Sequence, residues 1–241
     1  MAMMAATAAG AALAAGAAVV AGVAGEALAA ARHRRRGWRG AGYPGAMTPM
    51  TPLPREMWSR RLSWSAYLAT VSRNRDRFEE VYRQPSHGAG DLAWLRRLPP
   101  LRVLAIGEDW CPDVYHTLPT WARLVEELPG WEIGIFARDA NLDVMEAFLW
   151  QGDRQRIPVY AFYLGDRLQV WWSGRGAAAE QALAGFLAGR RFAALSEEER
   201  RRAAALLEEG YRREFRRQNL EEVLTLLGAF FHVAHVAEAA G

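Results

Sequence analysis

Hydrophobic and polar residues follow two different patterns between about residue 55 and residue 190. Apolar residues recur at helical spacing from Met57 to Tyr82, which predicts one or two amphipathic helices that end before Pro85. A short helix is predicted over 91–98. Strand-like and helical runs then alternate: strands over 101–107, 131–137, 158–164 and 168–172, and helices from 112 or 118 to 128, over 140–151 and over 176–189. This order predicts a sheet with helices on both faces.

Turn and capping residues define the rest of the chain. Gly165 and Asp166 separate two strand-like runs, which predicts a tight antiparallel hairpin. Ser196 and Glu199 have the spacing of a capping box, and the helix they begin is expected to end at Gly210. The last stretch, 220–237, is apolar around most of its circumference. It must therefore be covered, either by the N-terminal helices or by a second subunit in a homodimer.

The first 54 residues differ in composition from the remainder. Residues 1–31 are rich in Ala and Gly, four Arg and one His follow at 32–36, and 37–54 contain four prolines. A secretory signal would carry its positive charge before the apolar run, and this one carries it after. We interpret 1–54 as a disordered leader and linker, with Met47, Met50 and Met57 as alternative starts, and regard a membrane anchor at 5–31 as the second interpretation. The predicted division is 1–54, 55–192 and 193–241, in a cytoplasmic protein.

Charge and cysteine content exclude several classes of function. All 30 basic residues are Arg, but five of them lie in the first 46 residues against a single acidic residue, so the remaining chain carries a formal charge of −1. A nearly neutral body argues against a nucleic-acid partner. The single Cys excludes an internal disulfide and a Cys-rich zinc site. His232 and His235 lie three apart on a predicted helix but in an apolar segment, so we interpret them as core or interface residues and expect no metal and no cofactor.

The single cysteine lies where a strand-like run changes to a helical one. The sequence there is Glu108-Asp109-Trp110-Cys111-Pro112-Asp113. A helix start favours negative charge, so a thiol at this position can have a lowered pKa. A second signal, 46 residues later, is Ile157-Pro158 at the start of an apolar strand.

This combination resembles the thioredoxin family over about residues 60–190. The motif is closest to a bacterial subgroup with a Glu-Asp-Trp-Cys-x-Asp signature, followed here by Arg-Asp-Ala-Asn-Leu-Asp at 138–143 and by the Ile-Pro strand. The resemblance implies a thioredoxin-like three-layer α/β/α sandwich with N-terminal and C-terminal helical extensions. It also implies a cis Pro158 beside Cys111. The chain departs from the family's Cys-x-x-Cys motif because Val114 replaces the second cysteine.

By this resemblance Cys111 is the nucleophile, and Trp110, Ile157 and Pro158 form the substrate-binding surface around it. Without a resolving cysteine, a mixed disulfide with a protein or a low-molecular-weight thiol must be released by an external thiol. Proton transfer would fall to one of four groups around the motif: Glu108, Asp109, Asp113 or His116. Asp113 would raise the thiol pKa by like-charge repulsion, whereas a protonated His116 would lower it.

Two functions therefore remain open. The first is monothiol exchange of thiols and disulfides through Cys111. The second is a redox-inactive thioredoxin-like module for protein interaction, in which Cys111 is a buried small apolar residue. The pKa of the Cys111 thiol distinguishes them.

Overall fold

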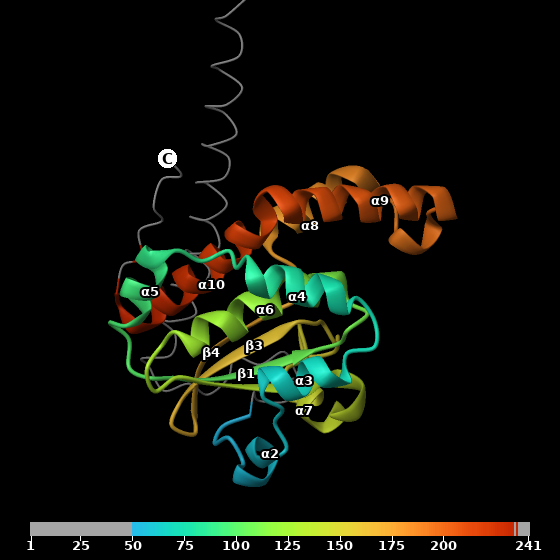
Figure 1. Cartoon of the computed structure of the whole chain (residues 1–241). Coiled ribbons are helices and arrows are strands. Elements are labelled where there is room, and N and C mark those ends of the chain that lie inside the picture. Colours follow the sequence, from blue (N-terminus) through green and yellow to red (C-terminus); the bar gives the residue numbers. More distant parts are fainter. Residues whose placement is uncertain (1–49, 234, 236–241) are drawn as a thin grey trace, which may run out of the picture.

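A four-stranded mixed sheet forms the centre of the computed structural model, which describes residues 50–233 and 235 (Figure 1). The strands are β1 (Arg102–Gly107), β2 (Glu132–Ala137), β3 (Val159–Leu164) and β4 (Arg167–Ser173), in the spatial order β2-β1-β3-β4. β1 is parallel to β2 and antiparallel to β3, and β3 is antiparallel to β4. The hairpin predicted at Gly165 is confirmed, and its positive φ of 63° explains the glycine.

Helices cover both faces of the sheet. On one face, α6 (Pro112–Glu126) and α10 (Arg216–Phe231) share a core with the inward side chains of β1, such as Val103 and Ala105. On the other face, Leu104 and Ile106 pack against α7 (Leu142–Glu146) and the segment around α2 (Arg55–Ser59). Because both faces are buried, the central strands are almost continuously apolar. The predicted three-layer α/β/α class is confirmed.

The N-terminal segment forms three helices rather than the one or two predicted. They are α2, α3 (Trp64–Thr70) and α4 (Arg75–Arg83). Leu62 interrupts them because its backbone N–H and C=O both bond to Ile135 at the edge of β2, at 2.9 Å each. Asn74 interrupts them again with a left-handed φ of 57°. The remaining helix of this region, α5 (Ala89–Leu95), begins two residues and ends three residues before the predicted range 91–98.

The helix predicted over 140–151 is wrong in its length. A 3-10 turn, η1 (Arg138–Ala140), precedes α7, which ends at Glu146. Trp150 and Arg154 then exchange two backbone hydrogen bonds, of 2.7 and 3.1 Å, across a tight turn. A continuous helix is incompatible with that turn, and Gly152 within it has a positive φ of 83°.

The helix that begins at the Ser196–Glu199 box ends at Gly210, as predicted, but the chain stays helical beyond that residue. α9 (Glu197–Gly210) begins with the predicted Ser196–Glu199 capping box but continues through a π-helical turn, η3 (Tyr211–Phe215), into α10. Gly210 has helical dihedral angles, and a Cβ there would lie 2.0 Å from the Phe215 ring. The glycine therefore serves the close approach of a ring and does not stop the helix.

The C-terminal helix α10 is covered by its own chain. Its apolar residues Leu220, Val223, Leu224 and Leu227 are buried in the same core as α6. Helix α8 (Ala177–Leu187) and the 3-10 turn η2 (Phe192–Ala194) connect β4 to the extension. The homodimer through the C-terminal helix stays a prediction.

His232 and His235 do not share a helix as the sequence suggested. α10 ends at Phe231, and His232 has a left-handed φ of 57°. His235 lies beyond the helix, 3.2 Å from a carboxylate oxygen of Asp91 and edge-on to the Trp94 ring. The two histidines are therefore separated by the helix end.

No helix within residues 50–233 combines the length and the hydrophobicity that crossing a membrane requires. The leader, its alternative membrane anchor at 5–31 and most of the linker lie outside the described residues.

Candidate functional site

Cys111 is the N-cap residue of α6, directly after β1. Pro112 occupies the first helical position, where its fixed φ suits a helix and its missing N–H costs no hydrogen bond. The backbone carbonyl of Cys111 accepts the first helical bonds, from Val114 at 3.1 Å and Tyr115 at 3.2 Å. Its side chain is 7% exposed, and Sγ lies 3.9 Å from the carbonyl oxygen of Ile157. The thiol and the Ile157-Pro158 segment thus meet, 46 residues apart in sequence.

The topology explains this meeting. β3 runs antiparallel to β1 and pairs Ile106 with Val159, so the residues before β3 lie at the end of β1 from which Cys111 follows. The peptide bond between Ile157 and Pro158 is cis. The carbonyl of Pro158 accepts a 2.8 Å hydrogen bond from Gly174 at the end of β4.

Val114 fills the position of the absent second cysteine. It is fully buried, and a Cβ on Gly107 would lie 2.6 Å from its Cγ1 atom. Gly107 therefore allows the first turn of α6 to pack against the end of β1. At the position where the family motif has its second thiol, this chain therefore has an apolar side chain packed against the end of β1.

The surroundings of Cys111 oppose ionisation of its thiol. Burial, followed by the negative charge of Asp113, raises the pKa of Cys111 to about 11. The backbone N–H groups of Val114 and Asp113 and the charge of Arg175 act in the opposite direction but are outweighed. The thiol is therefore almost entirely protonated at pH 7.

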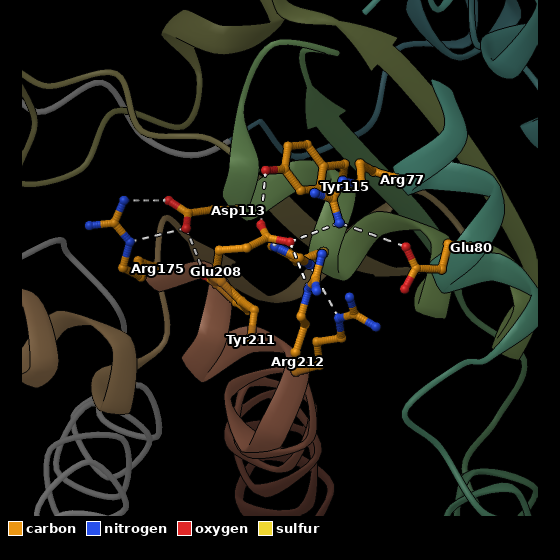
Figure 2. A network of polar contacts seen from close by, with 10 residues as sticks. Arg77, Glu80, Asp113, Tyr115, Arg175, Glu208, Tyr211 and Arg212 are labelled. Carbon is orange, nitrogen blue, oxygen red and sulfur yellow. Dashed lines mark hydrogen bonds and ion pairs between the residues drawn. The ribbon is translucent and has the colours of Figure 1, made fainter. Parts of the chain in front are cut away.

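Asp113 is buried and tied to the C-terminal extension (Figure 2). The guanidinium of Arg175 forms a bidentate ion pair with its carboxylate, through Nε at 3.0 Å and Nη2 at 2.9 Å. The hydroxyl of Tyr211, from η3, donates to the same carboxylate at 2.7 Å. Burial and the neighbouring charge of Asp113 hold the pKa of Tyr211 well above its ordinary value, so the tyrosine is a neutral donor. Asp113 thus joins the first turn of α6 to the extension.

His116 belongs to the same network. Arg216 donates from Nε to His116 Nδ1 at 3.2 Å, so the ring proton must be on Nε2, which donates to Glu208 at 2.9 Å. Burial holds the pKa of His116 down to about 4, and its ring stacks on Tyr211 with centroids 4.4 Å apart. A neutral His116 committed to these partners does not activate Cys111.

Glu108 and Asp109 bind backbone groups of neighbouring segments. Glu108 accepts the N–H of Asp139 at 2.6 Å, and burial raises the pKa of Glu108. Asp109 accepts the N–H groups of Ser72 at 2.8 Å and Arg73 at 2.9 Å. Burial acts to raise the pKa of Asp109, but these donors outweigh it, and the net shift is downward. Both carboxylates thus connect the cysteine loop to other loops.

Trp110 is the exposed aromatic residue of the motif, and Pro112 is exposed as well. The side chain of Trp110 is 41% exposed, and the guanidinium of Arg138 lies 5.3 Å from the centroid of one of its rings. Leu142 is 49% exposed and is the first residue of α7, which follows β2 after the 3-10 turn η1. Since β1 and β2 are parallel and pair Gly107 with Ala137, both loops leave the same end of the sheet.

Tyr67 is a residue of the site that sequence reasoning missed. It is 2% exposed, and its hydroxyl has no hydrogen-bond partner within the described part of the chain. Burial, followed by the charges of Glu108, Asp109 and Cys111, raises its pKa. Tyr67 belongs to α3, outside the motif, and in sequence it only contributes to the apolar spacing of 57–82. No local signal marks it as a neighbour of the thiol.

No cluster of three or more His, Cys, Asp or Glu side chains suited to a metal ion occurs in the described ranges 50–233 and 235.

A family model described as "Thioredoxin" matches residues 61–186, which is more than half of the chain. The chain belongs to the thioredoxin family. The match includes the Cys111 loop, the Ile157-Pro158 segment and helices α3 to α8, whereas α9 and α10 lie beyond it.

Two solved structures share the fold of this thioredoxin-family chain. One is a protein of unknown function from Pseudomonas aeruginosa, with 16% identity and a TM-score of 0.53 over 73% of this chain and 96% of that one. The other is an HIV epitope-scaffold, with 16% identity and a TM-score of 0.51 over 73% of this chain and 97% of that one. At this identity the likeness concerns the fold alone. A search of curated proteins found no match.

Proposed function

We propose that this thioredoxin-family chain is a protein-interaction module in which Cys111 is a poorly reactive thiol. The observation that carries the proposal is the commitment of every candidate activating group to another partner. Asp113 pairs with Arg175, His116 lies between Glu208 and Arg216, and the other two carboxylates of the motif accept backbone N–H groups. A nucleophilic thiol needs a lowered pKa or an adjacent base, and this arrangement supplies neither.

The surface offered to a partner is the loop face at the carboxyl end of β1 and β2. Trp110 and Leu142 expose large apolar side chains there, and Arg138 lies over the indole of Trp110. Exposed aromatic side chains with a neighbouring arginine are typical anchors of protein interfaces. The backbone at Ile157, beside Pro158, is a second position at which an extended peptide would pair.

Monothiol exchange is the second candidate. It is favoured by the placement of Cys111 at the N-cap of α6, where backbone N–H groups face the sulfur, and by the 3.9 Å approach of Sγ to Ile157. In this reaction the Cys111 thiolate attacks a disulfide, forms a new S–S bond and expels the other sulfur as a thiolate. An external thiolate then attacks the mixed disulfide and releases Cys111. The substrates would be proteins or low-molecular-weight disulfides.

Alkylation kinetics of the full chain separate the two candidates. The interaction module predicts a thiol pKa above about 9 and no mixed disulfide with glutathione disulfide at pH 7. It also predicts that Cys111→Ser lowers the free energy of unfolding by about 1–3 kcal/mol, because the substitution puts an unpaired hydroxyl into an apolar site. A thiol pKa below about 7 with rapid, thiol-reversible adduct formation, absent in Cys111→Ser, would establish monothiol exchange instead.

The interface is tested separately by substitution of its exposed aromatic residue. Trp110→Ala should abolish crosslinking to a purified partner while leaving the melting temperature unchanged, because the side chain is largely outside the core. Phe192→Ala is the matched control, since Phe192 is a similarly exposed aromatic residue on η2. Equal crosslinking by both variants would place the interface elsewhere.

A further inference from the structure

A cavity of about 610 Å³ lies between the C-terminal extension and the first turn of α6. It is separate from the Trp110 loop face and outside the role proposed for that face. Its volume lies within the range of about 300–1,000 Å³ that is typical of small-molecule sites. The wall is contributed by α4, α6, α8, η2 and α9, with one residue from the turn before α8. The extension therefore creates the cavity, because without α9 this side would be open.

The two ends of the cavity differ in chemistry. At the extension end the lining is apolar and includes Leu183, Phe192, Ala205 and Leu207. Phe192 is 47% exposed, so a large ring borders the opening. The opposite end contains the charged side chains of Arg77, Arg175 and Glu208 beside the hydroxyl of Tyr115. A ligand that matches both ends is amphipathic.

Positive charge exceeds negative charge at the polar end. Ion pairs and hydrogen bonds connect four arginines and three carboxylates in this region, most of them labelled in Figure 2, and burial keeps His116 neutral. These charged side chains are Arg77, Arg175, Arg212, Arg216, Glu80, Asp113 and Glu208. Of these, only Arg77, Arg175 and Glu208 line the cavity, so its wall carries two positive charges and one negative charge. A single negative charge on a ligand would balance the excess.

Hydrogen-bond donors remain for such a ligand. Arg175 uses Nε and Nη2 on Asp113, and its Nη1 has no hydrogen-bond partner among the described residues. Arg77 uses Nη1 for both Glu208, at 2.9 Å, and Glu80, at 3.8 Å. No hydrogen bond from its Nη2 to residues 50–233 is formed. The guanidinium groups are held in place by their carboxylates and still present N–H groups, which is the geometry that recognises a carboxylate.

We propose that this cavity binds an amphipathic monocarboxylate, with its apolar body between α8, η2 and α9 and its carboxylate at Arg175 and Arg77. The ligand would bridge the extension and the thioredoxin domain beside Pro112.

Isothermal titration calorimetry of the full chain tests the proposal with decanoate, decanol and decylamine, each below its aggregation concentration. These probes share one chain and differ in head-group charge. Decanoate should bind with a Kd at least tenfold lower than decanol, because charge-assisted hydrogen bonds exceed neutral ones, and decylamine should bind weakest. Equal affinities for decanoate and decanol, or no binding of any probe, would overturn the proposal.

Two tryptophan variants locate the site. Ala205→Trp fills the cavity from an exposed position on α9 and should abolish decanoate binding without loss of melting temperature. Ala194→Trp is the matched control, because Ala194 is exposed on η2 but does not line the cavity. Decanoate binding that survives Ala205→Trp would place the ligand elsewhere and refute the site. Arg175→Gln, if it folds, should raise the Kd of decanoate about tenfold and leave that of decanol unchanged.

Discussion

Replacing Asp113 by asparagine tests the electrostatics of the site most directly. Asp113 raises the pKa of Cys111 and at the same time compensates the charge of Arg175. Asp113→Asn keeps the size of the side chain and removes its charge. The thiol pKa and the stability of the fold should therefore both decrease.

The size of each effect follows from the contacts. The pKa of Cys111 is raised from 9.0 to about 11, and burial is the larger cause. The charge of Asp113 is the second cause, and the unpaired Arg175 adds a favourable charge, so we expect the thiol pKa to decrease by about one unit, or ~1.4 kcal/mol. Breaking a buried ion pair costs about 3–5 kcal/mol. Since the side chain of Arg175 is 20% exposed, we expect the lower end, about 3 kcal/mol.

The assays are iodoacetamide alkylation followed by mass spectrometry across pH, and thermal unfolding. At pH 9 the variant should react about tenfold faster than the wild type. Its melting temperature should fall by roughly 6–12 °C, at about 2–4 °C for each kcal/mol in a chain of this size. The matched control is Asp153→Asn, an exposed aspartate paired with Arg154 at 3.8 Å, which should change neither quantity. An unchanged thiol pKa together with an unchanged melting temperature would refute the electrostatic reasoning.

Three further predictions concern the elements around the site. The pKa of His116 is about 4 in the folded protein and ordinarily 6.5, so the unfolded chain binds more protons between these values and stability falls as pH decreases from 6.5 to 4. His116→Gln should reduce this decrease by about 3 kcal/mol in pH-dependent unfolding, and an identical slope would contradict the assignment. Phe78→Ala should cost about 3–5 kcal/mol in denaturant unfolding, because Phe78 is fully buried; a loss below about 1 kcal/mol would show that the site collapses around the deletion. A chain that starts at Met57 should have a lower melting temperature than one that starts at Met47, because the shorter chain lacks Leu53. Leu53 is buried, and its backbone N–H donates a 2.7 Å hydrogen bond to the carbonyl of Asp166. Equal melting temperatures would show that this segment adds no stability.

The pattern of apolar and polar residues was sufficient to predict the sheet and the turn between β1 and α6 that contains Cys111. The strand ranges were correct to within about a residue because both faces of this sheet are buried, so the apolar runs coincide with the strands. Helix boundaries were less accurate where long-range contacts set them. Leu62 joins the edge of β2 and Phe215 packs on Gly210, and neither contact has a local sequence signal.

The sequence by itself determined the family, the cysteine at the N-cap of α6 and the absence of a resolving thiol, because these depend on short motifs that occur in a fixed order along the chain. Only the tertiary structure decided what surrounds that thiol. Asp113 was recognised as a neighbour of Cys111, but its commitment to Arg175 and Tyr211 comes from residues 62 and 98 positions away. His116 was a candidate for activating Cys111 until its ring was found between Glu208 and Arg216. Reactivity depends on burial and charge summed over such distant contacts, which a local motif does not contain.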